Sequence, residues 1–422
     1  MARRTMAAAT AHVLPEASAI DAGRLSIGGC DCEELAREHG TPAYVIAEDD
    51  LRARAQAFAG ALSDHHDGPG EVVFASKAMP CTAVLRVFAE EGLGCDVASG
   101  GELHLALKAG FDPARLYLHG NAKSDGELAE ALEAGVGTIV LDNAQEAQRL
   151  SALLGGARQR VLLRVTPGVD ADTHEAILTG QAGSKFGFAP VDARALMTDP
   201  PAGLELAGLH MHLGSQLFAL EPYRRAIGAL AALGEFEVYD LGGGLGVPYA
   251  AGDPHLDVDT WVAGMVAAAR AELGPGRTIV LEPGRALVAN AGVTLYRVES
   301  VKEGAAGELL VAVDGGMSDN LRPMLYGSGY EAHLVDRMGG DGRPCTVVGK
   351  HCESGDVLVR DARLAEPSPG DVLVTPATGA YGHAMANNYN GIPRPPVVFC
   401  SGGRSRVVMR RETYEDLSAR DA

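Results

Sequence analysis

The chain has 422 residues, of which 46% are hydrophobic and 22% are charged, and its mean hydropathy is +0.03. These values are typical of a globular protein that is long enough for two domains. The formal net charge of −19 argues against nucleic acid or an anionic membrane as a partner, because both would repel the chain. No run of 18 or more uncharged apolar residues occurs, so we expect no membrane-spanning helix.

The seven cysteines form no CxxC pair of the zinc-binding type, and we expect no metal. They are Cys30, Cys32, Cys81, Cys95, Cys345, Cys352 and Cys400. An odd number of scattered cysteines is typical of reduced thiols, which predicts a cytoplasmic location. At the N-terminus Arg3 and Arg4 precede an alanine-rich run, but no apolar core of a signal peptide follows.

Eight short apolar or β-branched runs alternate with stretches that carry helix signals, and the first five begin about 22 residues apart. The runs begin near Val72, Gly94, Leu116, Thr138 and Arg160, and continue at 206–211, 237–241 and 278–281. Between them, Ser124 and Glu127 form a capping box and Asn143 is placed to cap a helix. This alternation predicts parallel βαβ units, and eight units predict an α/β fold of the (β/α)8 TIM-like barrel type. A leucine-rich solenoid shares the repeat length, but its spacing of leucine and asparagine is missing.

From residue 291 the pattern changes to short alternating runs that Gly, Pro and Asp separate. The runs cover 293–301, 309–313, 346–348, 357–360 and 372–375. They predict a C-terminal antiparallel β-rich domain, and the strand-like segment 44–46 is a candidate to pair with it. We therefore expect a loose tail at 1–19, a strand segment at 20–44 that joins the β domain, a barrel at 45–290, and the β domain at 291–422.

Lys77 follows the first predicted barrel strand. A lysine at the carboxyl end of a barrel strand faces the end where such folds do chemistry, and its amine there suits a Schiff base. Most lysines are solvated surface charges, so the other strand ends decide the question. Asp96 lies in the second strand, and chemistry-bearing residues follow the sixth, seventh and eighth strands: His212 and Ser215, then 242–246, then Glu282, Gly284 and Arg285.

The glycine-rich loops after the seventh and eighth strands are where barrels commonly hold a phosphate. Glycine lets backbone N–H groups approach phosphate oxygens, and Ser215 and Arg285 add donors. An amine, a phosphate cradle and an acid together fit pyridoxal 5'-phosphate, whose pyridine nitrogen Glu282 would keep protonated. His212 offers a flat imidazole that could stack on the ring. Taken alone, the glycine run at 242–246 also fits a tight turn, and it matches a dinucleotide fingerprint poorly.

Further motifs occur in order along the chain, at 74–78, 95–102, 174–175, 185–187, 212–215, 282–285, 321–326, 351–356, 380–381 and 388–390. In these motifs the chain resembles the barrel-type pyridoxal-phosphate-dependent decarboxylases (fold type III), and most closely the diaminopimelate decarboxylase family. The similarity runs from about residue 25 to 415. It implies decarboxylation of meso-2,6-diaminopimelate to L-lysine and carbon dioxide, the last step of lysine biosynthesis.

The resemblance also implies a role for each matching residue. Lys77 would bind the cofactor covalently, His212 would stack on it, and Glu282 would contact the pyridine nitrogen, with Asp96 nearby. Ser215, Gly243, Gly244, Gly284 and Arg285 would lie at the phosphate, which Tyr381 would also reach. Arg285, Arg322, Tyr326, Glu353 and Tyr381 would bind the substrate. Cys352 would return a proton after carbon dioxide leaves, and Cys352 and Glu353 would come from the partner subunit of a homodimer.

The chemistry of the substrate agrees with these residues. The far end of diaminopimelate carries a carboxylate, which arginines and a tyrosine bind well, and an ammonium, which Glu353 would pair with. One alternative is a paralogue that acts on another amino acid or a carrier-bound substrate, for which the fairly short chain and the run Gly-Ser-Gly-Tyr-Glu-Ala after Tyr326 leave room. A non-catalytic protein that binds pyridoxal phosphate is a second alternative, although Lys77 and Cys352 are both present. A flavin or nicotinamide barrel would show no Schiff-base absorbance.

Overall fold

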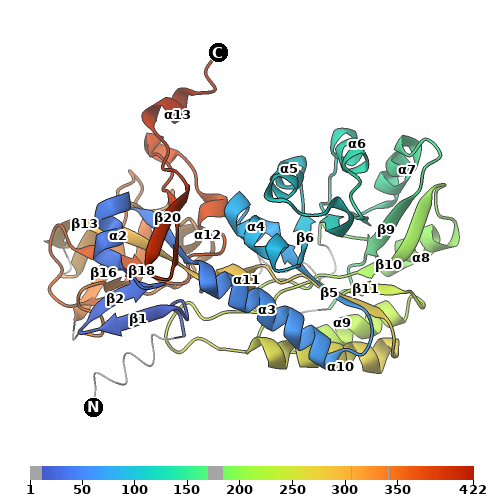
Figure 1. Ribbon diagram of the computed structural model, residues 1–422, viewed down its shortest axis with the longest axis horizontal. Coiled ribbons are helices and arrows are strands. Elements are labelled where there is room, and N and C mark those ends of the chain that lie inside the picture. The colour runs from blue at the N-terminus through green and yellow to red at the C-terminus, as the bar shows by residue number, and fades with distance from the viewer. Residues whose placement is uncertain (1–11, 170–183, 306, 341) are drawn as a thin grey trace. The chain divides into compact units, whose positions relative to one another are not determined.

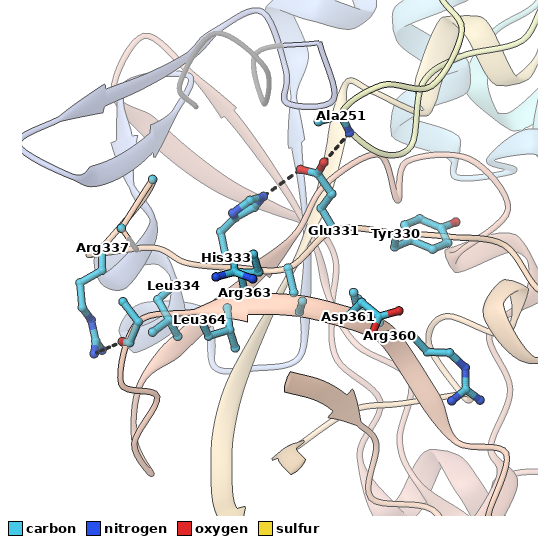
Figure 2. Close-up of a pocket in the computed structure, with 16 residues that line it drawn as sticks. Ala251, Tyr330, Glu331, His333, Leu334, Arg337, Arg360, Asp361, Arg363 and Leu364 are labelled. Carbon is cyan, nitrogen blue, oxygen red and sulfur yellow. Dashed lines mark hydrogen bonds and ion pairs between the residues drawn. The ribbon is translucent and has the colours of Figure 1, made fainter. Parts of the chain in front are cut away.

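The computed structural model describes residues 12–169, 184–305, 307–340 and 342–422, and its chain forms two compact units (Figure 1). The barrel unit consists of 53–246 and 255–286, and the β unit consists of the described residues up to 52 together with 247–254 and 287–422. The units change at residues 52 and 286, whereas the expected boundaries are at 44 and 290, and the loop 247–254 lies outside the barrel unit. That loop belongs to the β unit, where the Ala251 N–H donates to the Glu331 carboxylate (Figure 2).

The barrel unit is a closed barrel of parallel strands, which confirms the predicted fold class. Its strands are β5 (Gly70–Ala75), β6 (Gly94–Val97), β7 (Leu116–Leu118), β8 (Thr138–Leu141), β9 (Gln159–Arg164), β10 (Leu204–His210), β11 (Val238–Asp240) and β12 (Thr278–Leu281). Pairing of β12 with β5 closes the barrel. Six of the strands contribute to one buried cluster, made of Val73, Tyr117, Val140, Leu162, Val238 and Val280.

Helices follow the strands of the barrel unit. They are α4 (Thr82–Glu90), α5 (Gly100–Ala109), α6 (Asp125–Ala134), α7 (Ala144–Leu153), α8 (Pro190–Thr198), α9 (Glu221–Ala231) and α10 (Val258–Leu273), with short 3-10 turns at Ser76–Ala78 and Pro113–Arg115. The predicted capping box of Ser124 and Glu127 starts α6, and Asn143 caps α7 by accepting from the Glu146 N–H. Helices α9 and α10 lie side by side (Figure 1). No helix in the described part of the chain is long and apolar enough to cross a bilayer.

The β unit contains a nine-stranded sheet whose main path is β17-β16-β14-β13-β4-β19-β20, with β18 and β15 beside it. The strands are β4 (Ala43–Ala47), β13 (Gly292–Glu303), β14 (Leu309–Val313), β15 (His333–Leu334), β16 (Arg343–Val348), β17 (Val357–Leu364), β18 (Val372–Thr375), β19 (Val397–Ser401) and β20 (Arg404–Met409). As expected from the segment 44–46, β4 pairs with this sheet, antiparallel to β13. The sheet is mixed rather than wholly antiparallel, because β14 is parallel to β16 and β19 is parallel to β4.

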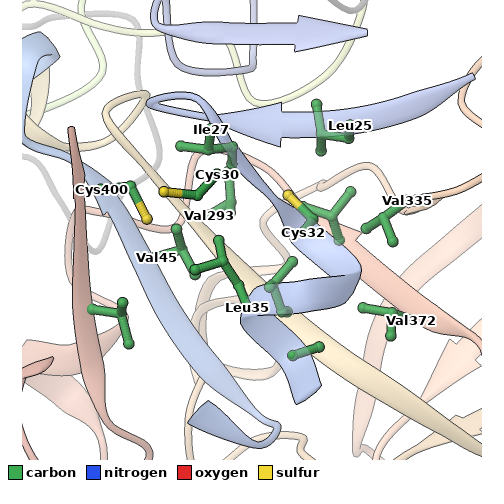
Figure 3. Close-up of a cluster of buried hydrophobic side chains, with 14 of the residues drawn as sticks. Leu25, Ile27, Cys30, Cys32, Leu35, Val45, Val293, Val335, Val372 and Cys400 are labelled. Atoms are coloured by element: carbon green, nitrogen blue, oxygen red, sulfur yellow. The ribbon is translucent and has the colours of Figure 1, made fainter. Parts of the chain in front are cut away.

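The N-terminal segment packs on this sheet. Strands β1 (Ser18–Asp21), β2 (Arg24–Ile27) and β3 (Cys30–Asp31) form a small antiparallel sheet, followed by α2 (Cys32–His39). Figure 3 shows Leu25 and Leu35 in the same buried cluster as Val45. The described end of the expected loose tail is ordered, because Val13 and Leu14 are buried. Residues 1–11 and the motif His174–Glu175 lie outside the described residues.

Four further helices complete the described chain. Helix α3 (Glu48–His65) begins directly after β4, and α11 (Arg285–Val288) begins shortly after β12. Helix α12 (Arg322–Tyr326) and the C-terminal α13 (Tyr414–Ser418) belong to the β unit, as do short 3-10 turns at His383–Met385 and Tyr389–Gly391. Helix α11 begins at Arg285 and α12 begins at Arg322, so both predicted arginines occupy the first position of a helix.

Candidate active site

The predicted barrel residues gather at one end of the barrel. Lys77 lies in the 3-10 turn after β5, and Asp96 lies in β6. His212 and Ser215 follow β10, Gly243 and Gly244 follow β11, and Glu282, Gly284 and Arg285 follow β12. Because all eight strands are parallel, their carboxyl ends share one face, which is where barrel enzymes place their catalytic residues.

Glu282 is a buried acid that two imidazoles contact. Its side chain is 4% exposed, and its Oε1 lies 2.8 Å from the Nε2 of His119. Its Oε2 lies 3.3 Å from the Nε2 of His210, which is 1% exposed. Asp240 completes the group, and one N or O atom of each of the four side chains lies within 4.8 Å of the others. The sequence prediction included Glu282 but missed the other three.

These contacts decide which acid carries charge. Burial by itself would raise the pKa of Glu282, but His119 and His210 hold it well below its ordinary value. Burial and the nearby Glu282 carboxylate raise the pKa of Asp240 well above its ordinary value. Burial lowers the pKa of His210 to about 4, so its neutral ring presents an N–H to Glu282 near pH 7. Glu282 is therefore the ionised acid of the group.

Asp96 and Lys77 lie within electrostatic reach of each other. Burial raises the pKa of Asp96 to about 6, His119 and Lys77 oppose that rise, and Glu282 adds to it. Burial also lowers the pKa of His212 well below its ordinary value, and the charge of Lys77 acts in the same direction. His212 is thus a neutral ring, and its Nδ1 accepts from the Gly243 N–H at 3.3 Å. Lys77 itself is exposed to solvent at the end of β5.

The loop after β11 forms a cradle that only glycine fits. A Cβ on Gly243 would lie 2.1 Å from the carbonyl oxygen of Glu282, and a Cβ on Gly244 would lie 2.5 Å from the hydroxyl of Tyr223. Gly244 also has φ +116, a conformation that L side chains rarely adopt. These two positions therefore require glycine, and the loop they form follows the seventh barrel strand, where barrels commonly bind a phosphate.

Ser215 and Arg285 supply side-chain donors beside this loop. The Nε and Nη2 of Arg285 donate to the Oγ of Ser215 at 3.1 and 2.8 Å. Arg285 is 6% exposed, and it starts α11 just after Gly284. A Cβ on Gly284 would lie 3.0 Å from the Cβ of Ala75, at the end of β5. The loops after β10, β11 and β12 thus combine a hydroxyl, a guanidinium and a glycine-rich backbone.

The residues at this end of the barrel fit pyridoxal phosphate. Lys77 offers a primary amine, and the glycine cradle with Ser215 and Arg285 offers donors to a phosphate. The Oε1 of Glu282 is a buried oxygen of an ionised carboxylate, and it lies 2.8 Å from the Nε2 of His119 without a well-oriented hydrogen bond in the described part of the chain. Such an oxygen suits the protonated ring nitrogen of the cofactor.

The remaining predicted residues belong to the β unit. Arg322 is 5% exposed and Tyr326 is half-buried, both on α12. Tyr381 has φ +60, a strained conformation for a residue with a side chain, and it lies within electrostatic reach of Arg322. Cys352 and Glu353 are exposed on the loop between β16 and β17.

Hydrogen bonds hold the loop that carries Cys352 and Glu353. The Cys352 N–H donates to the Oδ1 of Asn390 at 3.0 Å, and the Tyr389 hydroxyl donates to the Glu353 carboxylate. Asp356 fixes the base of the loop by accepting from the N–H of His351 at 2.8 Å and from the N–H of Met317 at 2.7 Å. This loop therefore presents a thiol and a carboxylate to solvent in a defined conformation.

His119, His210 and Asp240 are the residues of this group to which the sequence analysis assigned no role. His119 directly follows β7, and His210 and Asp240 are the last residues of β10 and β11. They therefore carry the same signal that identified Lys77, which is a polar side chain where a barrel strand ends. Applying that rule to every strand would have found them.

Comparison with known proteins agrees with this site. Residues 48–289 match the family described as pyridoxal-dependent decarboxylase, pyridoxal binding domain. A diaminopimelate decarboxylase of Actinosynnema pretiosum subsp. auranticum is 48% identical, over 96% of this chain and 94% of that protein. One from Synechocystis sp. is 40% identical, over 97% and 93%.

A solved structure agrees as well. The diaminopimelate decarboxylase from M. jannaschii in co-complex with L-lysine has a TM-score of 0.91 and 31% identity, and the match covers 97% of this chain and 98% of that one. The similarity thus extends through both units, well beyond the residues of the family model. The chain belongs to the pyridoxal-dependent decarboxylases, within the diaminopimelate decarboxylase family.

Proposed function

We propose that the chain decarboxylates meso-2,6-diaminopimelate to L-lysine and carbon dioxide. One observation carries this proposal: an amine, a phosphate cradle and an ionised buried acid meet at the carboxyl ends of the barrel strands. Pyridoxal phosphate is the cofactor of this family. When bound, it supplies an electron sink for the electrons that the leaving carboxylate leaves behind.

The barrel residues would hold and orient this cofactor. We assign covalent attachment to the amine of Lys77 and the pyridine contact to Glu282, whose charge His119 and His210 maintain. Ser215, Arg285 and the glycine loop after β11 would bind the phosphate. His212, a neutral ring fixed by the Gly243 N–H, would cover one face of the cofactor ring. Asp96, whose Oδ1 lies 3.9 Å from the Nε2 of His119, would also lie near the cofactor.

We assign recognition of the distal end of the substrate to Arg322, Tyr326 and Tyr381, together with Arg285 and Glu353. The buried guanidinium of Arg322 suits a carboxylate, and the exposed acid Glu353 suits an ammonium. A substrate with an amino-acid group at each end satisfies both. A diamine with a single carboxylate, such as ornithine, would leave the arginine without an anion.

We assign the return of the proton to Cys352. It is the exposed cysteine, whereas the other six are buried. Burial raises the pKa of those six thiols, which keeps them protonated and unreactive. Free thiols throughout the chain also support a reducing compartment, for which we propose the cytoplasm.

We further propose that the enzyme is a homodimer that shares Cys352 and Glu353 between subunits. Met324, Leu325 and Tyr389 are exposed apolar side chains, and Tyr389 reaches this loop through its hydroxyl, which donates to Glu353. Met324 is next to the loop, because a Cβ on Gly355 would lie 3.5 Å from its Cε. Apolar groups that cluster on a surface are typical of a protein interface.

Mixing two inactive variants tests the shared site. Lys77→Ala lacks the amine and Cys352→Ala lacks the proton donor, so neither homodimer should form L-lysine normally. After random exchange of equal amounts, about half of the dimers would be mixed, and one site of each mixed dimer would be intact. Roughly a quarter of all sites would therefore recover. No recovery after confirmed subunit exchange would refute sharing between subunits, whereas sedimentation as a monomer would refute the dimer itself.

The activity is tested by incubating the protein and pyridoxal phosphate with meso-diaminopimelate, ornithine, arginine or lysine, and by measuring carbon dioxide. We expect release from diaminopimelate alone. Release from ornithine but not from diaminopimelate would overturn the substrate assignment. Failure with all four substrates would favour a paralogue that acts on another amino acid.

A further inference from the structure

Arg322 is a buried cation without a carboxylate partner in the part of the chain that the structure describes. Its side chain is 5% exposed, and its guanidinium makes one hydrogen bond there, to the hydroxyl of Tyr330. Burying an arginine without a counter-ion is unfavourable unless other contacts compensate for the lost hydration. The structure shows which contacts do so.

Two tyrosines enclose this guanidinium. Its central carbon lies 4.4 Å from the ring centroid of Tyr249 and 5.5 Å from that of Tyr330. The two rings pack edge to face, with centroids 5.1 Å apart and an interplanar angle of 76°. Both tyrosines are 5% exposed. Aromatic faces attract a cation without neutralising it, so Arg322 keeps its positive charge.

Hydrogen bonds to backbone N–H groups hold the segment that carries Tyr249. Asp253 accepts from the N–H groups of Tyr249 and Ala250 at 2.8 and 3.0 Å, which closes a turn. Figure 2 shows the next residue, Ala251, with its N–H on the carboxylate of Glu331. His333 contacts the other oxygen of that carboxylate at 2.9 Å. Glu331 directly follows Tyr330, so its hydrogen bond with Ala251 joins the two segments that carry Tyr249 and Tyr330.

We propose that Tyr249 and Tyr330 form a clamp that presets the Arg322 guanidinium as the receptor for the second carboxylate of the substrate. Both are then positioning residues that determine specificity. A flexible arginine loses rotamer freedom when it binds an anion. The clamp orders the side chain when the protein folds, so less freedom is lost when the anion binds. The clamp uses only Nη1 for a hydrogen bond, which leaves the other nitrogens of the guanidinium for a carboxylate. This inference rests on the proposed role of Arg322.

L-Lysine and 1,5-diaminopentane measure this recognition directly, because the two molecules differ only in one carboxylate. The product L-lysine retains the carboxylate that we assign to Arg322. The readout is the ratio of their inhibition constants against meso-diaminopimelate, measured on the holoenzyme. Arg322→Gln should lower the preference for L-lysine by about 10- to 100-fold, the usual effect of losing a charge-assisted hydrogen bond.

The clamp variants should lower the same preference by about tenfold, because each removes one restraint on the guanidinium. Tyr330→Phe deletes one hydroxyl, and Tyr249→Leu deletes one ring. KM for diaminopimelate should rise in both variants while kcat stays within about threefold, as expected for lost ground-state binding. Tyr249→Phe keeps the ring and should restore the preference.

Tyr239→Phe is the matched control. It removes a buried tyrosine hydroxyl that contacts only backbone, at Gly234 and Phe236, and it should leave the ratio unchanged. A reduced ratio in Arg322→Gln, with normal ratios in Tyr330→Phe and Tyr249→Leu, would overturn the clamp alone. An unchanged ratio in Arg322→Gln would overturn the assigned role of Arg322, and with it the clamp. If Tyr249→Leu does not fold, Tyr330→Phe decides, since it loses a single oxygen atom.

Discussion

Replacing Glu282 by glutamine should weaken cofactor binding while leaving the shape of the barrel end intact. The substitution removes one negative charge from a side chain that is 4% exposed. His119 and His210 normally keep that charge in place by holding the pKa of Glu282 low against the effect of burial. Without the carboxylate, the cationic ring nitrogen of pyridoxal phosphate would face only a neutral amide.

The size of the effect follows from the contact that is lost. A hydrogen bond to a charged group contributes about 1.5–3 kcal/mol. That range corresponds to an increase of about 10- to 150-fold in the dissociation constant of pyridoxal phosphate. His119→Ala should have a smaller effect in the same direction, because the carboxylate stays and only its pKa rises.

The assay is a titration of the cofactor-free protein with pyridoxal phosphate, followed by absorbance. Glu71→Gln is the matched control. Glu71 lies near the start of β5, at the opposite end of the strand from Lys77, where it pairs with Arg115 at 2.9 Å. We expect normal cofactor affinity in that control. Unchanged affinity in Glu282→Gln would refute the assignment of Glu282 to the pyridine nitrogen.

Three further predictions concern stability, pH and proton return. Lys123→Met breaks an ion pair with Glu146, 2.9 Å long and at most 2% exposed, and should lower the free energy of unfolding in urea by about 3–5 kcal/mol. The double variant Lys123→Met with Glu146→Leu should recover most of that loss. A Lys123→Met protein within about 1 kcal/mol of the parent would contradict the predicted loss. Burial lowers the pKa of His383 to about 4, so its contribution to stability is complete above the unfolded pKa of about 6.5 and is lost as pH falls through 4. Denaturation at several pH values should show a shallower acid slope in His383→Phe, by up to about 1.4 kcal/mol per pH unit, and an unchanged slope would count against it. Asn390→Ala removes the acceptor of the Cys352 N–H and should lower the L-lysine formed per carbon dioxide released, whereas equal yields would exclude a role in placing the thiol.

Local patterns along the chain determined where the elements lie. The apolar run near Val72 is β5, and the capping signals at Ser124 and Asn143 start α6 and α7. These signals depend on neighbouring residues, so they are readable without the fold. The placement of polar residues at the ends of predicted strands also indicated which residues meet at the end of the barrel, and Ser215 does contact Arg285 there. That inference depends only on strands running in the same direction.

Only the tertiary structure decided which distant segments pair. The alternating runs of the second domain looked alike in sequence, yet β14 is parallel to β16 whereas β13 is antiparallel to β14. Periodicity fixes which face of a strand is buried but carries no information on the direction of its neighbour. The assignment of 247–254 to the β unit and the clamp of Tyr249 on Arg322 arise in the same way. Each depends on contacts between residues far apart along the chain, which form only when the whole core has packed.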